Sequence, residues 1–291
     1  MRLVKTFLLC LSMQALTLSA QMYIFPTSYG PPDKYQVVDT AKYEITYQIA
    51  AKLNPNPKYS HVAYKDTQTL LIGKRIAATY SRDILQAREK AYAEIKQGAE
   101  TVDDFSGITF PEDVFKGYPK PGVLTTSYRL FLGAGYGQYT EALPDFKWQI
   151  QSETTKILGY TCQKALGEFR GRKYIAWFTS DIPLSDGPWK FCGLPGLILA
   201  VQDTEAYFVF TCIGVDNKST PIRFWTYPHT KSTREKLRAT ILRMHKQPIL
   251  FCEQSLGINI YIGNTNKNRD FSFPWLWLEA VSYTHLRAHE T

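Results

Sequence analysis

The chain has 291 residues, a formal net charge of +8 and 44% hydrophobic residues, enough for one large domain or two small ones with a sizeable core. Its lysines and arginines are scattered, apart from a helix-like cluster between Lys231 and Lys246. A nucleic-acid-binding protein would show a basic stripe and a recognised module. We therefore expect a solvated basic surface and no nucleic-acid partner.

The N-terminus has the layout of a secretory signal peptide. Arg2 and Lys5 precede an apolar run over 6–18, and small residues, Ser19 and Ala20, close it. The run is too short to span a bilayer, and no second apolar segment of about 18 residues follows. We therefore predict a signal peptide over 1–20, no transmembrane segment, and a periplasmic, extracellular or cell-surface location.

The first half of the chain is predicted to combine strands with one helix. Residues 42–49 alternate as a strand, and 67–80 form a strand pair punctuated by a glycine. Ser81 caps a helix that runs to about Gln97. Residues 103–121 are predicted to be a long loop with a short strand. The glycine-rich stretch 130–137 lacks the helix and the acidic residue of a dinucleotide site, so no cofactor is predicted.

From Lys147 the pattern is wholly β until about residue 215. Strands are expected over 148–152 and 156–165, followed by hairpins over 169–178 and 197–215. Serial strands without intervening helices indicate a mainly β (α+β) fold, a curved antiparallel sheet or open barrel or bowl with two or so short helices. We expect residues 21–280 to form a single domain.

The C-terminal part is predicted to close the fold with a helix and two strands. The sequence from Ser232 to Glu235 is a capping box that opens a helix ending at about Gln247. Strands are expected over 256–262 and 271–278. Residues 281–291 resemble a translated sequencing adapter and are kept out of the fold prediction. The two histidines of that tail are not taken as a metal pair, so no metal site is predicted.

The most distinctive stretch is Gly187 to Leu199, which surrounds large apolar residues with turn formers. Pro195 and Gly196 suit a type II turn, in which glycine accepts a positive φ. Together with Gly193 they are predicted to be a structural turn that delivers the next residues into a strand. The stretch contains no histidine, so it favours organising the fold over catalysis, and we predict no catalytic residue.

Four cysteines follow the predicted signal peptide, which allows up to two disulfides and three connectivities in an exported protein. Cys162 with Cys192 is the preferred pair because the two flank a hairpin-like region, and Cys212 with Cys252 follows by default.

Four side chains are candidates to face a ligand. Trp189 and Lys190 lie in the turn before Gly193. Arg170 and Arg172 flank a hairpin glycine and have the chemistry to clamp a carboxylate or sulfate. The tryptophans at 177, 189, 225, 275 and 277 have the chemistry to line a ligand groove, although packing in the core is the favoured interpretation.

Several segments together resemble a known family: 157–160, 162–165, 169–172, 176–178 and 187–199. The chain is similar to the GLPGLI family of secreted bacterial proteins, named for the hexapeptide at Gly193 to Ile198. The resemblance extends over about 43–215 and weakens beyond Pro221. It implies Sec-dependent export, a β-rich fold related to the bowl-shaped accessory domain of some glycan-releasing amidases, and no established activity or catalytic residues.

These observations favour a non-enzymatic binding protein for a glycan, a peptide or a protein partner. Two alternatives stay open. One is a hydrolase or an accessory domain of a glycan- or peptide-cleaving enzyme, since spatially paired carboxylates leave no sequence signature. The other is an accessory of an outer-membrane transporter, which rests on family analogy alone.

Overall fold

The computed structural model describes residues 6–9, 23–24, 33–52, 63–99, 102–103, 110–130, 134–226, 228–257 and 259–262. The helices are α1 (Arg82–Lys96), α2 (Arg234–Lys246) and α3 (Pro248–Leu256). The strands are β1 (Thr6–Leu9), β2 (Tyr23–Ile24), β3 (Tyr35–Lys52), β4 (Ala63–Gly73), β5 (Ala77–Ser81), β6 (Val102–Asp103), β7 (Glu112–Lys116), β8 (Val123–Arg129), β9 (Tyr136–Ala142), β10 (Gln149–Ile157), β11 (Tyr160–Phe169), β12 (Arg172–Thr179), β13 (Leu197–Asp203), β14 (Phe208–Asp216), β15 (Thr220–Trp225), β16 (His229–Lys231) and β17 (Asn259–Ile262).

Most of the described strands form one open sheet of 13 strands in the order β10-β11-β12-β13-β14-β3-β4-β5-β7-β8-β9-β16, with β15 beside β3. Strand β3 lies in the middle of this sheet and pairs with three other strands. One edge pairs with β4 from Ala41 to Lys52, and the other pairs with β15 near the start of β3 and with β14 near its end. Register shifts leave extra residues in β3, β10, β13 and β14, and such bulges bend a sheet and increase its twist.

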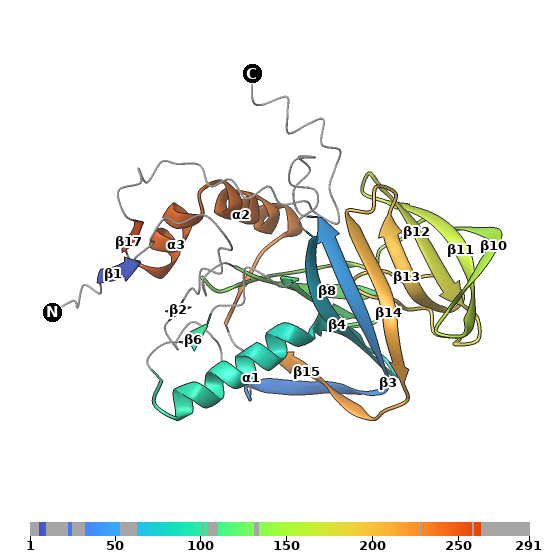
Figure 1. The fold of residues 1–291 in the computed structure, drawn as a ribbon, viewed down its shortest axis with the longest axis horizontal. Coiled ribbons are helices and arrows are strands. Elements are labelled where there is room, and N and C mark those ends of the chain that lie inside the picture. Colours follow the sequence, from blue (N-terminus) through green and yellow to red (C-terminus); the bar gives the residue numbers. More distant parts are fainter. Residues whose placement is uncertain are drawn as a thin grey trace, which may run out of the picture.

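The three helices cover separate parts of this sheet. Helix α1 contacts β4 and β5, and Figure 1 shows it on the same side as β15. Helix α2 packs on β9 and on α3, around the buried side chains of Leu237, Ile241 and Phe251. None of the described helices lies over β10–β14 in Figure 1. No helix in the described ranges has the length and apolar character needed to cross a membrane.

The predicted fold class is confirmed: the described chain is mostly β, the sheet is open, and the helices are short. Helix α1 begins where predicted, with the Ser81 hydroxyl accepting the amide N–H of Ile84 at 3.1 Å. The hairpin β11–β12 turns at Arg170 and Gly171, which both have a positive φ. The hairpin β13–β14 also forms.

Two predictions about the C-terminal part are wrong. The N-cap of α2 is Thr233 and not Ser232. Ser232 directly follows β16, and its amide N–H donates to the carbonyl oxygen of Gln138 on β9 at 2.8 Å, so Ser232 still belongs to the sheet. The strand predicted from residue 256 begins only at Asn259, because α3 occupies 248–256. Pro248 stands in the first turn of α3, where its missing N–H has no helical partner to lose.

Other predicted segments are only partly described. Of the predicted signal peptide, only Thr6–Leu9 is described; it pairs as β1 with β17, so the cleavage after Ala20 stays a prediction. The strand predicted over 271–278 and the tail 281–291 lie outside the described residues.

Two buried ionisable groups are expected to give the free energy of unfolding opposite pH dependences. Burial raises the pKa of Asp66, which lies near Asp83 and Arg129, to about 7. Burial lowers the pKa of His245 to about 4. Between about pH 4 and 6.5 the folded state holds a proton on Asp66 that the unfolded chain has lost, so this group makes stability fall as the pH rises. In the same window His245 makes stability rise, because the unfolded chain binds the proton there.

The two slopes should largely cancel in the wild type. In urea unfolding measured at several pH values, Asp66→Asn should make stability rise from about pH 4 to 6.5, and His245→Gln should make it fall. Unchanged pH profiles in both variants would contradict these pKa directions.

Candidate functional site

The stretch 187–199 packs into the core as a tight loop that ends in β13. Trp189 and Gly193 have positive φ values, and the Phe191 amide N–H bonds the Pro188 carbonyl oxygen at 3.0 Å. The Phe191 ring centroid lies 5.0 Å from that of Phe146, 5.1 Å from Tyr174, 5.3 Å from Trp189 and 5.9 Å from Phe210. The loop therefore supplies the centre of the aromatic core.

The turn at Pro195 and Gly196 is built differently from the type II prediction. Gly196 does not have a positive φ; a Cβ at this position would lie 2.1 Å from the carbonyl oxygen of Thr179. The left-handed conformation belongs to Gly193, with φ +94°. Glycine is thus required at 196 because two backbone segments touch, and at 193 because of φ.

Buried polar side chains hold this loop against the sheet. The Trp189 indole N–H donates to Glu112 at 2.6 Å, and its amide N–H donates to Gln68 at 3.0 Å. The Lys116 ammonium group donates to the carbonyl oxygens of Gly187 and Phe191 at 2.7 and 3.1 Å, and it forms an ion pair with Asp186. A ligand that approached from solvent would not meet the Trp189 ring, which is only 1% exposed.

The other three candidate ligand-facing residues bind carboxylates of the protein itself. Lys190 is fully buried; its ammonium group donates to the Tyr139 hydroxyl at 2.6 Å and to Glu141 at 2.9 Å. Arg170 pairs with the same Glu141, and Arg172 pairs with Asp203. The two arginines therefore pair with two different carboxylates of the protein, Glu141 and Asp203.

The predicted disulfides are wrong: Cys162, Cys192 and Cys212 are free thiols, so neither proposed pair forms. Cys162 and Cys212 are buried together in an apolar cluster with Leu197 and Leu199, whereas Cys192 stays in the loop, near the carbonyl oxygen of Pro144. Burial raises the pKa of the Cys162 and Cys192 thiols, and that of Cys212 to about 11. Such thiols are poor nucleophiles at neutral pH.

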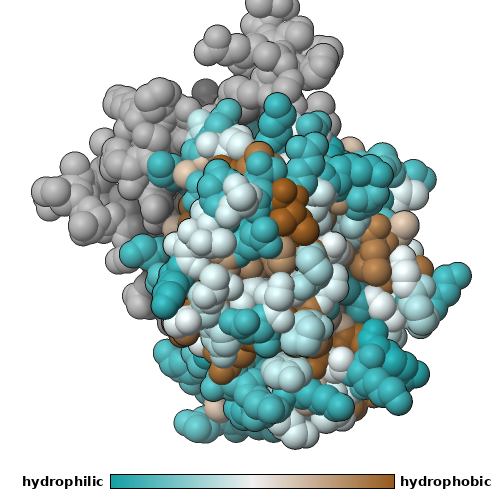
Figure 2. Space-filling model, turned by 90° about the vertical axis from the view of Figure 1, so that its right-hand side faces the viewer, coloured by the Kyte–Doolittle hydropathy of each residue, from teal (hydrophilic) through white to brown (hydrophobic). Residues whose placement is uncertain are grey.

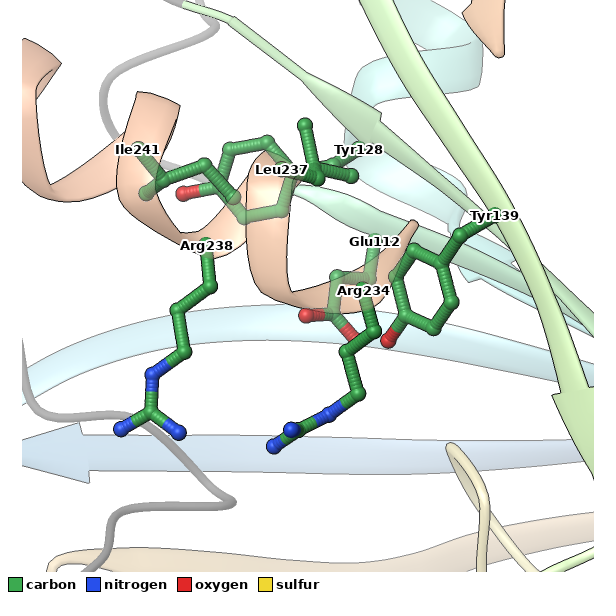
Figure 3. A pocket seen from close by; sticks show the side chains of 7 residues that line it. All are labelled: Glu112, Tyr128, Tyr139, Arg234, Leu237, Arg238 and Ile241. Carbon is green, nitrogen blue, oxygen red and sulfur yellow. The ribbon is translucent and has the colours of Figure 1, made fainter. Parts of the chain in front are cut away.

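A small pocket lies where α2 meets the sheet. Figure 3 shows Arg234 and Arg238 extending to the same side from α2, with Glu112 and Tyr139 beside Arg234. The cavity measures about 20 Å³, space for about one water molecule. Since Glu112 and Tyr139 also bind Trp189 and Lys190, this pocket belongs to the packing around the loop and is too small for an organic ligand.

A larger groove shares Tyr139 with this pocket and is the candidate binding site. Its volume is about 520 Å³, within the range of small-molecule sites. Four segments line it: the turn after β7, strand β8, strand β9, and the stretch that contains β15 and β16. We call it the β9–β15 groove; its lining is Tyr118, Pro119, Thr125, Gln138, Tyr139, Thr140, Phe224, Trp225, Thr226, His229, Lys231 and Ser232.

Aromatic rings form one wall of the groove. The ring centroids of Tyr118 and Phe224 lie 4.5 Å apart, and those of Phe224 and His229 lie 6.2 Å apart and nearly parallel. Trp225, the next residue on β15, is buried against Tyr80, and its indole N–H has no hydrogen-bond partner among the described residues. The lining is thus rich in aromatic side chains.

Sequence reasoning found only Trp225 among these lining residues. The usable signal was local: 223–225 carries two adjacent aromatics on a strand, and Tyr118-Pro119 forms a turn. What brings the two together is the bent sheet, so the sequence offered no measure of their distance. No cluster of potential metal ligands occurs in the described ranges.

The fold and the groove define an open-sheet β protein with an aromatic groove at one end of its sheet. Residues 168–200 match a family model described as "Protein of unknown function (Porph_ging)". No curated protein matches the chain. Two solved structures of PNGF-II, in the P21 and C2 space groups, are 17% identical, with TM-scores of 0.45 and 0.47. Each alignment covers 72% of this chain and 34% of the other, so the chain spans about a third of that protein.

Proposed function

We propose that the chain is an exported, non-enzymatic binding protein of the GLPGLI type, located in the cell envelope or outside the cell, and that its ligand occupies the β9–β15 groove. The observation that carries this proposal is the groove itself, about 520 Å³ with aromatic, hydroxyl and amide side chains in its lining. The signal-peptide pattern over 1–20 supports export.

The lining supports binding over hydrolysis. The described residues that line the groove include no aspartate or glutamate, and a glycoside hydrolase would place two carboxylates around the bond that it cleaves. Asp186 is paired with Lys116 beneath the loop, and Glu153 is paired with Lys164 on exposed β10. These carboxylates are engaged away from the groove.

The rest of the surface offers less for a ligand. Figure 2 shows the β10–β12 side of the molecule, where apolar residues form separate patches among hydrophilic ones. Ile150, Leu158, Leu166 and Ile213 are the large apolar side chains exposed in strands β10, β11 and β14 and their turns. Scattered exposed apolar residues of this kind are normal on a soluble surface.

The test is to block the groove. Thr140 is exposed on β9 and lines the groove, so Thr140→Trp should fill it and weaken binding by at least about tenfold. Ligands would be found on glycan and peptide arrays with the full chain, and affinities measured by calorimetry. Thr211→Trp is the matched control, because Thr211 is exposed on β14 and does not line the groove. If every ligand binds Thr140→Trp as well as the wild type, the groove is not the site.

A further inference from the structure

The aromatic wall of the β9–β15 groove suits the flat apolar face of a sugar ring. Tyr118 and His229 both lie beside the Phe224 ring, and all three side chains are partly exposed. Aromatic faces attract C–H groups and polarised rings while excluding water. A pyranose presents such a C–H face and, around its edge, a ring of hydroxyl groups.

Other residues of the lining supply partners for those hydroxyl groups. Gln138 and Thr140 project from β9, and Ser232 follows β16. Hydroxyl and amide side chains both donate and accept hydrogen bonds, which fits vicinal hydroxyl groups of a sugar. Gln138 is oriented by its own hydrogen bond to Ser127 at 3.1 Å, so the amide is held in place before a ligand arrives.

The charge of the lining favours an acidic ligand. Lys231 is exposed at the groove, and His229 lies two residues before it on β16. The described lining residues include the Lys231 ammonium group and no carboxylate, on a chain whose formal net charge is +8, which favours an anionic ligand. An ammonium group recognises a carboxylate or sulfate through charge-assisted hydrogen bonds.

The strand arrangement disfavours an extended peptide. Peptides that enter beside a sheet commonly add a strand to an open edge. Here β16 already pairs with β9 through Gly137 and its two neighbours, and β16 itself is only three residues long. The groove therefore presents side chains rather than a long row of unpaired main-chain groups.

We propose that the β9–β15 groove binds an acidic oligosaccharide, with sugar rings against Tyr118 and His229 and the acidic group at Lys231. This inference rests on the proposed function and specifies its ligand class.

The test uses two probes that differ only in charge: a trimer of galacturonic acid and its methyl ester. Calorimetry with the full chain should show the acid binding at least about tenfold more tightly than the ester, and more weakly as salt increases. Lys231→Gln should weaken binding of the acid by about tenfold and leave the ester unchanged. Lys147→Gln is the matched control, because Lys147 is exposed and does not line the groove.

A chondroitin fragment and a sialylated trisaccharide would serve as further acidic probes, and an oligoglutamate as an acidic peptide. Equal affinity for acid and ester, tighter binding of oligoglutamate than of all three sugars, or no binding of any acidic sugar would overturn the inference. If a neutral glycan or peptide binds the wild type and its binding is lost only in Thr140→Trp, the proposed function stands while this inference fails. Ligands that are all insensitive to Thr140→Trp would refute both.

Discussion

Replacing Gly196 with alanine is expected to lower the free energy of unfolding by more than about 3 kcal/mol. A Cβ at 196 would lie 2.1 Å from the Thr179 carbonyl oxygen and 2.6 Å from its carbonyl carbon, and backbone atoms cannot rotate away. Relief would require Leu197 to separate from Thr179, its partner in the β12–β13 pairing. Urea unfolding followed by tryptophan fluorescence measures the loss, and a larger side chain such as valine should abolish folding.

Alanine substitutions at two other glycines distinguish steric crowding from backbone strain. An alanine Cβ at position 193 would have space, with Trp148 Cδ1 at 3.7 Å, but the residue has a positive φ. Gly193→Ala should therefore lower the free energy of unfolding by about 1–2 kcal/mol. Alanine at position 214 causes neither crowding nor backbone strain, because the nearest atom, Thr46 Cβ, is 3.9 Å away and φ is not positive. Gly214→Ala should change the free energy of unfolding by no more than about 1 kcal/mol. A Gly196→Ala protein more stable than Gly193→Ala would show that the close backbone approach is not the constraint.

Replacing Lys190 with methionine is expected to destabilise the protein by about 3–5 kcal/mol. The ammonium group is fully buried between Tyr139 and Glu141, so its loss leaves a largely buried carboxylate with less compensating charge. The same loss removes the hydrogen bond from Lys190 to the Tyr139 hydroxyl, and Tyr139 lines the β9–β15 groove. Unfolding in urea gives the stability change, and ligand affinity of the folded fraction reports the effect on the groove.

The double variant Lys190→Met with Glu141→Gln should recover part of this loss, because it removes the uncompensated charge as well. Lys147→Met provides the exposed comparison; its side chain is 77% exposed beside Asp145, so the change should be within about 0.5 kcal/mol. A Lys190→Met protein as stable as Lys147→Met would mean that the buried ion pair makes no net contribution.

Local patterns predicted the secondary structure of the central chain well. Alternation marked β11–β14, and Tyr174, Ala176 and Phe178 lie buried on one face, as expected. The errors fall where tertiary contacts override local preference. The hydrogen bond of Ser232 to Gln138 moves the start of α2, and burial among apolar neighbours keeps Cys162 apart from Cys192.

The candidate site was largely beyond sequence reasoning. Trp189 and Lys190 are unusual residues in a distinctive motif, which made them candidates, yet the same motif buries them. Whether a lysine in a turn faces water or a glutamate depends on a strand some 50 residues away, here β9 with Glu141. The groove joins Tyr118 to Phe224, a pairing that local sequence does not encode.

The sequence by itself determined that this is a mainly β protein with a structural turn at 193–196, because alternation, turn formers and helix caps act over a few residues. The tertiary structure decided why Gly196 must be glycine, where the buried cations go, and where a groove opens. Those outcomes depend on the bends of one long sheet, which bring distant segments into contact and set which side chains lose their water.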